Sequence, residues 1–143
     1  MSFASDVERI AGKMETSVEK VAAGVFIKLF QSVIQATPVD TGRLRGEWQT
    51  TKKSKATALA NRKQIKNFGP SSQQAKKVIK DPDVYYLTNL MPYAHTVEYG
   101  KYGKGPGVTE KTAGTGFSIQ APRGMIRINV KRIKRLVKRE AAK

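Results

Sequence analysis

The sequence contains no cysteine and only one histidine, His95. The missing cysteines exclude disulfide bonds, thiol catalysis and thiolate metal sites, and a single histidine disfavours a histidine metal site within one chain. No apolar run approaches the roughly 18 residues of a membrane span, and the N-terminal residues MSFASDVERIAG have no apolar signal core. We therefore predict a protein made in the cytoplasm, with no membrane partner, no metal and no cofactor.

Acidic residues are also scarce, because 11 Asp and Glu stand against 27 Lys and Arg, for a formal net charge of +16. Residues 1–36 are neutral, whereas residues 37–80 carry eleven basic and two acidic groups and residues 81–143 carry twelve basic and five acidic groups. Such a field attracts nucleic acid or an acidic protein surface. With 143 residues and 39% hydrophobic content, residues 1–143 are expected to form one domain with a modest core.

A long apolar stripe at helical spacing occupies residues 5–36 and predicts one long N-terminal helix. Ser5 is the expected N-cap, and Thr37 ends the helix because the residue before a proline avoids helical geometry. Such a helix measures about 48 Å and exceeds the roughly 40 Å diameter of a domain this size. It is expected to overhang the domain or to kink at Gly24. An overhanging stripe predicts self-association, through an interface containing Val18, Val25 and Leu29.

The middle of the chain predicts short strands and a basic insertion. Residues 44–51 and 84–90 are rich in β-branched or aromatic residues and predict strands, and residues 117–120 predict another short one. Residues 52–80 are polar and basic, which predicts a flexible exposed loop or hairpin extension. We expect this extension to end in a short helix near residues 71–79.

The C-terminal half completes the expected fold. Residues 92–99 predict a short helix or strand, residues 100–116 a glycine-rich loop, and the chain from about residue 122 an amphipathic helix. The expected fold class is α+β. A long N-terminal helix packs on a small, mostly antiparallel sheet, with the basic extension and a C-terminal helix completing it.

The triplet Asp40-Thr41-Gly42 matches the catalytic triplet of aspartic proteases, in which two aspartates share one proton. Arg43 follows directly, and a guanidinium there favours two ionised carboxylates, which is the opposite of what that reaction needs. A turn fits better, because Pro38 sets its start, Asp40 bonds forward to the backbone, and Gly42 takes a conformation that other residues avoid. We therefore expect no catalytic residues and no enzyme.

His95 and Glu98 lie close together in sequence but lack a nucleophile or a metal partner. We expect a structural role for His95. We also expect Glu98 to pair with Arg43 or Arg45, which would join the two halves of the chain.

A glycine-rich loop and a basic C-terminal segment were compared with known ligand-binding patterns. The loop at residues 100–116 lacks the Gly-Lys-Ser/Thr ending of phosphate-binding loops. Residues 123–143 hold nine basic residues and one acidic residue, a pattern that binds nucleic acid, an anionic membrane or an acidic protein groove, or that simply forms a solvated face. The interleaved aromatic residues of a single-strand binder are missing there.

The segments TPVDTGRLRGEW (residues 37–48) and PYAHTVEYG (residues 92–100) resemble signature segments of the head–tail neck, or tail-completion, proteins of long-tailed bacteriophages. The resemblance spans nearly the whole chain, from the long helix to an Ala-Pro-Arg segment before the last helix. Residues 123–125 depart from it, because apolar residues usually stand there, and the insertion at 52–80 is unusually basic. The matching residues are Asp40, Thr41, Gly42, Leu44, Tyr93, Ala94, Val97, Glu98 and Gly100.

The resemblance implies a structural virion protein that forms a ring, expected to be a homohexamer, at the head–tail neck through which DNA passes. It implies assembly in the host bacterial cytoplasm and connector or stopper proteins and tail terminator or tube proteins as neighbours. A nonspecific nucleic-acid-binding protein is the alternative. Nine basic residues of the insertion are expected to face either an acidic partner ring or DNA in the lumen: Lys52, Lys53, Lys55, Arg62, Lys63, Lys66, Lys76, Lys77 and Lys80.

Overall fold

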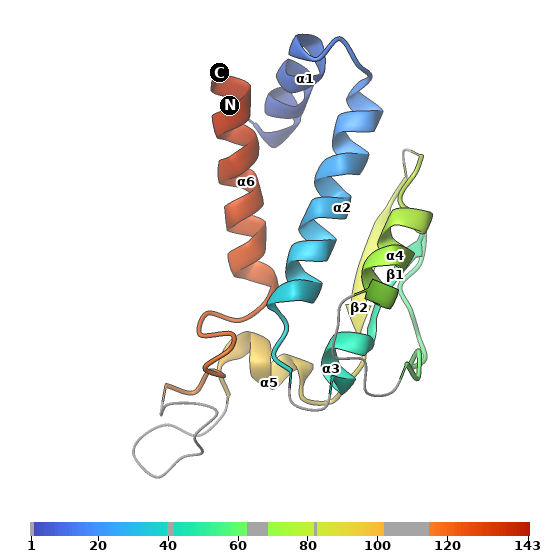
Figure 1. The fold of residues 1–143 in the computed structure, drawn as a ribbon, viewed down its shortest axis with the longest axis vertical. Helices are drawn as coiled ribbons and strands as arrows, with labels where there is room; N and C mark the ends of the chain where they lie inside the picture. The colour runs from blue at the N-terminus through green and yellow to red at the C-terminus, as the bar shows by residue number, and fades with distance from the viewer. Residues whose placement is uncertain (1, 40–41, 63–68, 82, 102–114) are drawn as a thin grey trace.

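The structure of this chain is a computed structural model, and it describes residues 2–39, 42–62, 69–81, 83–101 and 115–143. Figure 1 shows three layers, with α2 (Val18–Ala36) between α6 (Ile126–Ala142) and a layer that contains α4 (Gly69–Val78) and a β-hairpin. The hairpin pairs β1 (Trp48–Lys52) with β2 (Tyr85–Asn89) in antiparallel orientation. The expected α+β fold with a small antiparallel sheet and a C-terminal helix is confirmed.

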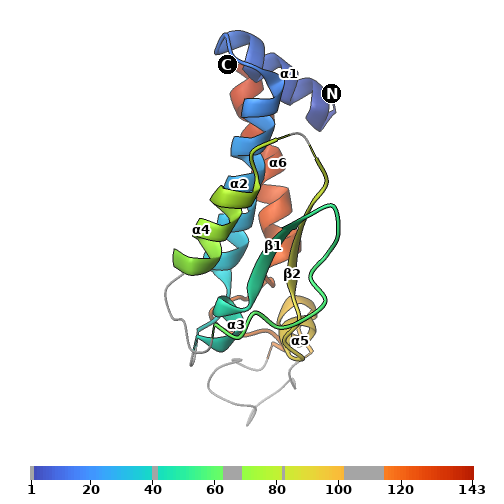
Figure 2. The same ribbon diagram turned by 90° about the vertical axis from the view of Figure 1, so that its right-hand side faces the viewer.

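The remaining helices close the two ends of these layers. At one end, α1 (Phe3–Lys13) contacts both α2 and α6, and both chain termini lie there (Figure 1). At the other end lie two short helices, α3 (Arg43–Gly46) and α5 (Ala94–Tyr99). Figure 2 shows α4 and the hairpin side by side in front of α2, with α6 behind.

The prediction of one long helix over residues 5–36 was wrong, because the chain turns back between α1 and α2. Glu15 adopts a left-handed φ of 52°, and Ser17 caps α2 by accepting a hydrogen bond from the Lys20 N–H at 3.2 Å. The first helix is capped by Ser2 rather than Ser5. The break lies at this turn and not at Gly24, because folding back lets α1 bury its apolar face against α6. No overhanging stripe remains within the described residues.

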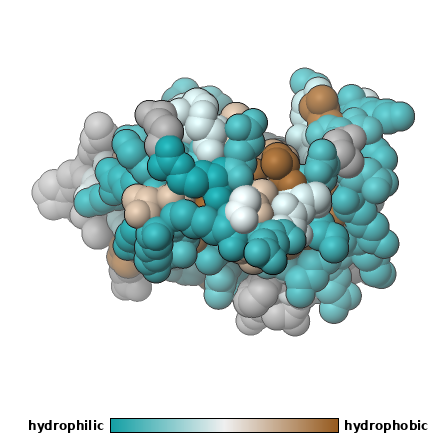
Figure 3. All heavy atoms as spheres, turned by 90° about the horizontal axis from the view of Figure 1, so that it is seen from above, coloured by the Kyte–Doolittle hydropathy of each residue, from teal (hydrophilic) through white to brown (hydrophobic). Residues whose placement is uncertain are grey.

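Two apolar clusters form the core on either side of α2. One gathers Trp48, Leu44, Val97 and Met125 around the end of α2, and the other packs α1 against α6 through Val7, Ile133 and Val137. Leu29 packs against both clusters, so the middle layer connects them. The end of the molecule formed by α1 shows mostly hydrophilic side chains, with small separate hydrophobic patches, one of them in a hollow (Figure 3).

Several predicted boundaries differ from the observed ones. The predicted strand 44–51 begins only at Trp48, since residues 43–46 form α3. Residues 117–120 form turns instead of a strand. The helix near 71–79 begins earlier, at Gly69, and the last helix begins at Ile126 rather than near residue 122. The strand 84–90 is confirmed as β2, and residues 94–99 of the 92–99 segment are helical.

No helix among the described residues combines the length and apolar character needed to cross a membrane. The glycine-rich loop prediction falls mainly on residues 102–114, which lie outside the described residues.

Candidate functional site

The first motif segment forms the elbow between α2 and β1. Gly42 has a φ of 89°, in the left-handed region that only glycine adopts easily, and it precedes α3 directly. Leu44 then enters the core with 3% exposure. Asp40 and Thr41 lie outside the described residues, so their predicted turn role stays a prediction.

The second motif segment holds the beginning of α6 through Glu98. Its Oε1 accepts hydrogen bonds from the main-chain N–H groups of Met125 (2.6 Å) and Ile126 (2.7 Å). Its Oε2 accepts from the Arg127 N–H (3.1 Å) and the Arg127 Nε (2.9 Å). The carboxylate therefore satisfies three N–H groups that a helix N-terminus otherwise leaves unpaired. It does so from a different element 27 residues away in sequence.

These contacts set the ionisation of Glu98. Burial by itself raises the pKa of the carboxyl group, but the hydrogen bonds from Ile126, Met125 and Arg127 outweigh burial and hold the pKa of Glu98 below its ordinary value. A charged carboxylate beneath a helix N-terminus is a structural cap, and it presents no free oxygen for proton transfer.

The predicted pairing of Glu98 with Arg43 or Arg45 was wrong. Arg45 instead donates through Nη2 to the main-chain oxygens of Gln35 (2.9 Å) and Thr37 (3.0 Å), at the C-terminus of α2. Its positive charge there suits the negative end of the helix dipole. The two motif segments meet in the core instead, where Leu44 and Val97 belong to one apolar cluster.

Two glycines allow the segments around Glu98 to approach closely. Gly100, with a φ of 65°, faces the Phe117 ring so closely that a Cβ would overlap it. At Gly124, where φ is 85°, a Cβ would lie 2.6 Å from the Glu98 main-chain oxygen. Gly124 was missed at the sequence level, where residues 123–125 counted only as a departure from the family pattern. Its left-handed φ and its contact with Glu98 explain why a glycine stands there.

The other motif residues are structural or exposed. Tyr93 is 38% exposed, Ala94 is half-buried against the core, and Val97 is buried. The His95 ring lies 4.5 Å from that of Tyr99, and the Arg127 guanidinium stacks 4.3 Å above Tyr99. No group of three or more metal-ligating His, Asp or Glu side chains occurs in the described part of the chain.

The basic insertion is anchored to the domain by Arg62. Its Nη1 donates to the main-chain oxygens of Gly46 (3.0 Å) and Trp48 (2.6 Å), and its Nη2 donates to Gln74 Oε1 (2.9 Å). Burial lowers the pKa of Arg62, and the nearby Glu47 carboxylate opposes that shift. Arg62 therefore joins β1 to α4. It was predicted to face an acidic partner or DNA, but its guanidinium is occupied by these contacts within the chain.

The other basic residues of the insertion fall into three groups. Lys52 lies 3.7 Å from Asp83 and 3.9 Å from Asp81. Lys63 and Lys66 lie outside the described residues. Lys52 is exposed as well, and the remaining exposed lysines, which form no ion pair among the described residues, are Lys53, Lys55, Lys76, Lys77 and Lys80. The flexibility predicted for 52–80 stays a prediction, although hydrogen bonds from Gln49 to Ala58 and from Asn61 to Glu47 fix parts of this segment.

A largely apolar groove follows one side of α2. Its first part lies between α2 and residues 81–85 and also contains Glu19, Asp81 and Asp83, its middle part lies between α2, β2 and α6, and its last part lies between α2, α6 and α1. Three cavities of about 290, 220 and 170 Å³ succeed one another there and share lining residues. Val18 lines the first, Val25 lines the third, and Leu29 lines the last two. We call this feature the α2 groove, and its apolar lining comprises Phe3, Val18, Ala22, Ala23, Val25, Phe26, Leu29, Phe30, Val33, Tyr85, Tyr86, Leu87, Ile126, Val130 and Ile133.

The three residues predicted for the oligomer interface therefore lie on one groove, although they differ in exposure. Val18 is 41% exposed, whereas Val25 and Leu29 are half-buried and also pack against the core. The groove was missed at the sequence level, because residues 81–87 and α6 supply most of its walls and neither segment is near α2 in sequence.

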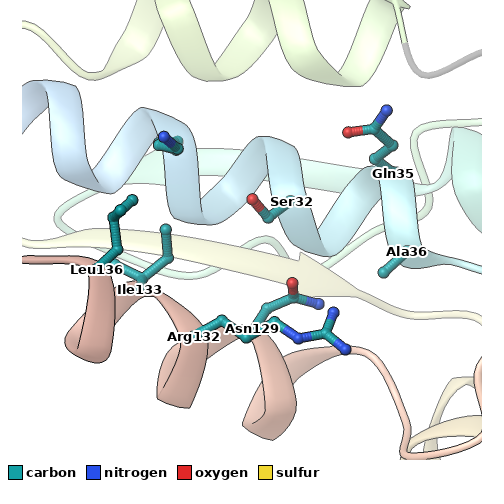
Figure 4. Close-up of a pocket in the computed structure, with 8 residues that line it drawn as sticks. Ser32, Gln35, Ala36, Asn129, Arg132, Ile133 and Leu136 are labelled. Atoms are coloured by element: carbon teal, nitrogen blue, oxygen red, sulfur yellow. The ribbon is translucent and has the colours of Figure 1, made fainter.

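A more polar cavity of about 390 Å³ also lies between α2 and α6. Figure 4 shows Ser32 and Gln35 projecting from α2 on one side and Asn129 and Arg132 projecting from α6 on the other. Lys28 also lines it. Two cations beside amide and hydroxyl groups suit a phosphate or a carboxylate.

No protein-family model, curated protein or solved structure matches this chain significantly.

Proposed function

We propose that this chain is a structural virion protein that forms a homo-oligomeric ring, expected to be a hexamer, at the head–tail neck of a long-tailed bacteriophage. The α2 groove carries the proposal. No described residue covers this largely apolar surface, and all three residues expected at the oligomer interface line it. Connector or stopper proteins and tail terminator or tube proteins are the proposed neighbours.

The motif residues support a non-enzymatic role. Gly42 forms an elbow, Leu44 and Val97 fill the core, and Glu98 caps α6. In this arrangement, the segments that resemble the neck proteins build the fold itself. The function then lies on the surface that the fold presents.

A charge substitution in the groove tests the ring. In Val18→Asp, a carboxylate would be desolvated at the subunit contact, and the oligomer should dissociate while the far-ultraviolet circular dichroism spectrum is retained. The matched control is Ile119→Asp, because Ile119 is 55% exposed and lines none of the three cavities of the groove. Under conditions in which the wild type assembles into necks, negative-stain images should show rings for the wild type and Ile119→Asp only. A wild-type protein that stays monomeric at high concentration and in virions would contradict the proposal.

Nonspecific nucleic-acid binding is the second candidate. The cavity with Lys28 and Arg132 favours it, as do the exposed basic residues of α6. Arg132→Gln, with Lys28→Gln, should then weaken DNA binding and flatten its dependence on salt. A ring that forms without DNA supports the neck protein, whereas assembly only on DNA supports the alternative.

A further inference from the structure

The two outer edges of the hairpin differ in whether their backbone hydrogen-bonding groups have partners. Lys53 N–H donates to the Val84 oxygen at 2.8 Å, which fixes the alternation of the antiparallel ladder. The backbone groups of Trp48 and Thr50 therefore point away from β2, and those of Tyr85 and Leu87 point away from β1. One outer edge belongs to each strand.

The edge of β1 is closed. The outward Thr50 N–H donates to Gln74 Oε1 at 3.0 Å, and the outward Trp48 oxygen accepts from Arg62 at 2.6 Å. Helix α4 also packs against this strand. Another strand cannot pair here without displacing these side chains.

The edge of β2 is open. Within the described residues, the outward backbone groups of Tyr85 and Leu87 have no hydrogen-bond partner. The strand carries no lysine or proline, the residues that commonly protect such edges. A two-stranded sheet is also marginal alone, and a third strand would add to its stability. The α2 groove begins beside this edge, because Tyr85 and Leu87 line it.

The charge distribution indicates what can approach this edge. The chain has a net charge of +16, so two copies repel each other over most of their surfaces. Residues 81–100 contain no lysine or arginine. Residues 85–89 of β2 carry no charge at all, so pairing along this strand brings no like charges directly opposite each other. Since the edge of β1 is closed, β2 is also the only open strand edge that a second copy offers among the described residues.

We propose that two copies of the chain pair through β2 in antiparallel orientation, forming a four-stranded sheet. The outward groups lie on Tyr85, Leu87 and Asn89, so the twofold axis passes beside Leu87, and Tyr85 of one copy faces Asn89 of the other. Inner-face side chains of the added strand then cover the middle cavity of the α2 groove, which Tyr85 and Leu87 line. This contact is distinct from the proposed ring contact. A twofold pair joins two copies and adds no third, and it occupies part of the groove that the ring contact would use. It describes the free protein before neck assembly.

Cysteine pairs test the register, since the natural chain has no cysteine. The twofold pairing places Val84 of one copy opposite Leu90 of the other, and both side chains are exposed, at 59% and 37%. Within one chain these positions are roughly 20 Å apart along the strand, too far for a disulfide. V84C/L90C should therefore form a covalent dimer under mild oxidation. The single variants V84C and L90C are the matched controls and should stay largely monomeric on a non-reducing gel.

The outcomes separate this pairing from the ring. Efficient crosslinking of the double variant alone supports it, with at least a tenfold excess of dimer over either single variant. Equal crosslinking of all three variants, or none in the double variant, overturns it. Rings seen by electron microscopy without this crosslink would leave the proposed function standing and remove the β2 pair. Crosslinked dimers without rings would support the β2 pair and contradict the proposed ring.

Discussion

Replacing Glu98 by glutamine should destabilise the protein more than any ordinary surface change. Glutamine keeps one oxygen for the N–H groups of Met125 and Ile126 but places an NH₂ group against the N–H and Nε of Arg127. A hydrogen bond to a charged group contributes about 1.5–3 kcal/mol. The charge at the helix N-terminus contributes about 0.3–1 kcal/mol more.

The ion pair itself adds little. The Arg127 side chain is 55% exposed, so solvent screens the pair and leaves about 0–1 kcal/mol. The hydrogen-bond and helix-dipole terms alone therefore predict that Glu98→Gln lowers the free energy of unfolding by about 2–4 kcal/mol. For a chain of this size, the melting temperature should fall by roughly 8–16 °C.

Urea and thermal unfolding followed by circular dichroism measure this change. Glu8→Gln is the control, because Glu8 is an exposed residue of α1, and its stability should match the wild type. Hydrogen exchange at the amides of residues 125–127 should accelerate in Glu98→Gln, which locates the loss at the start of α6. A decrease below about 0.5 kcal/mol, the ordinary range for surface changes, would refute the capping role.

The same cap predicts how stability depends on pH. The pKa of Glu98 is lower in the folded protein than in the unfolded chain, so the folded state favours the charged form. Its contribution is present above the unfolded value of about 4.3 and is lost as the pH falls through the folded pKa. Stability should therefore decrease below about pH 4.5, and the decrease should be smaller in Glu98→Gln, as urea titrations at several pH values would show.

Three further substitutions test particular backbone and surface features. Gly42→Val should cost about 1–3 kcal/mol because of its left-handed φ, whereas Gly24→Ala, in open space within α2, should be neutral or stabilising, as chemical denaturation would measure. Gly124→Ala should destabilise the fold and speed amide exchange at the start of α6, since its Cβ would meet the Glu98 oxygen, and wild-type exchange would contradict this. Serine at the exposed lysines of the insertion should leave the fold intact and block head–tail joining in an in vitro assembly assay; normal joining with lost DNA delivery would instead favour luminal DNA contact. The lysines replaced are Lys53, Lys55, Lys76, Lys77 and Lys80, and Lys52 is kept because it faces Asp81 and Asp83.

The sequence predicted the elements better than their ends. The apolar period of α6 and the strand residues of β2 are local signals, and both elements occur where they were expected. The helix over residues 5–36 was predicted as continuous, because its apolar period runs through the turn. The turn is favoured by burial of α1 on α6, a contact between residues more than 120 apart, which no local pattern records.

The partner of Glu98 shows the same limit. The sequence indicated that a carboxylate in the second motif needs a positive partner, and this was correct in kind, because the partner is Arg127. The sequence analysis chose Arg43 or Arg45, which belong to the other motif segment. It could not show that the N-terminus of α6, with Arg127, lies beside Glu98 in the fold. The role of Gly124 also depended on this contact, and so it emerged only with the fold.

The sequence alone determined the charge, the absence of thiol chemistry, the α+β class and the glycine at the elbow, because each of these follows from residue types or from neighbours along the chain. The tertiary structure alone decided the α2 groove, the cap on α6, the closed edge of β1 and the open edge of β2. Each of these joins elements distant in sequence, and the free energy that selects them is the burial and hydrogen bonding that exist only after the chain has folded.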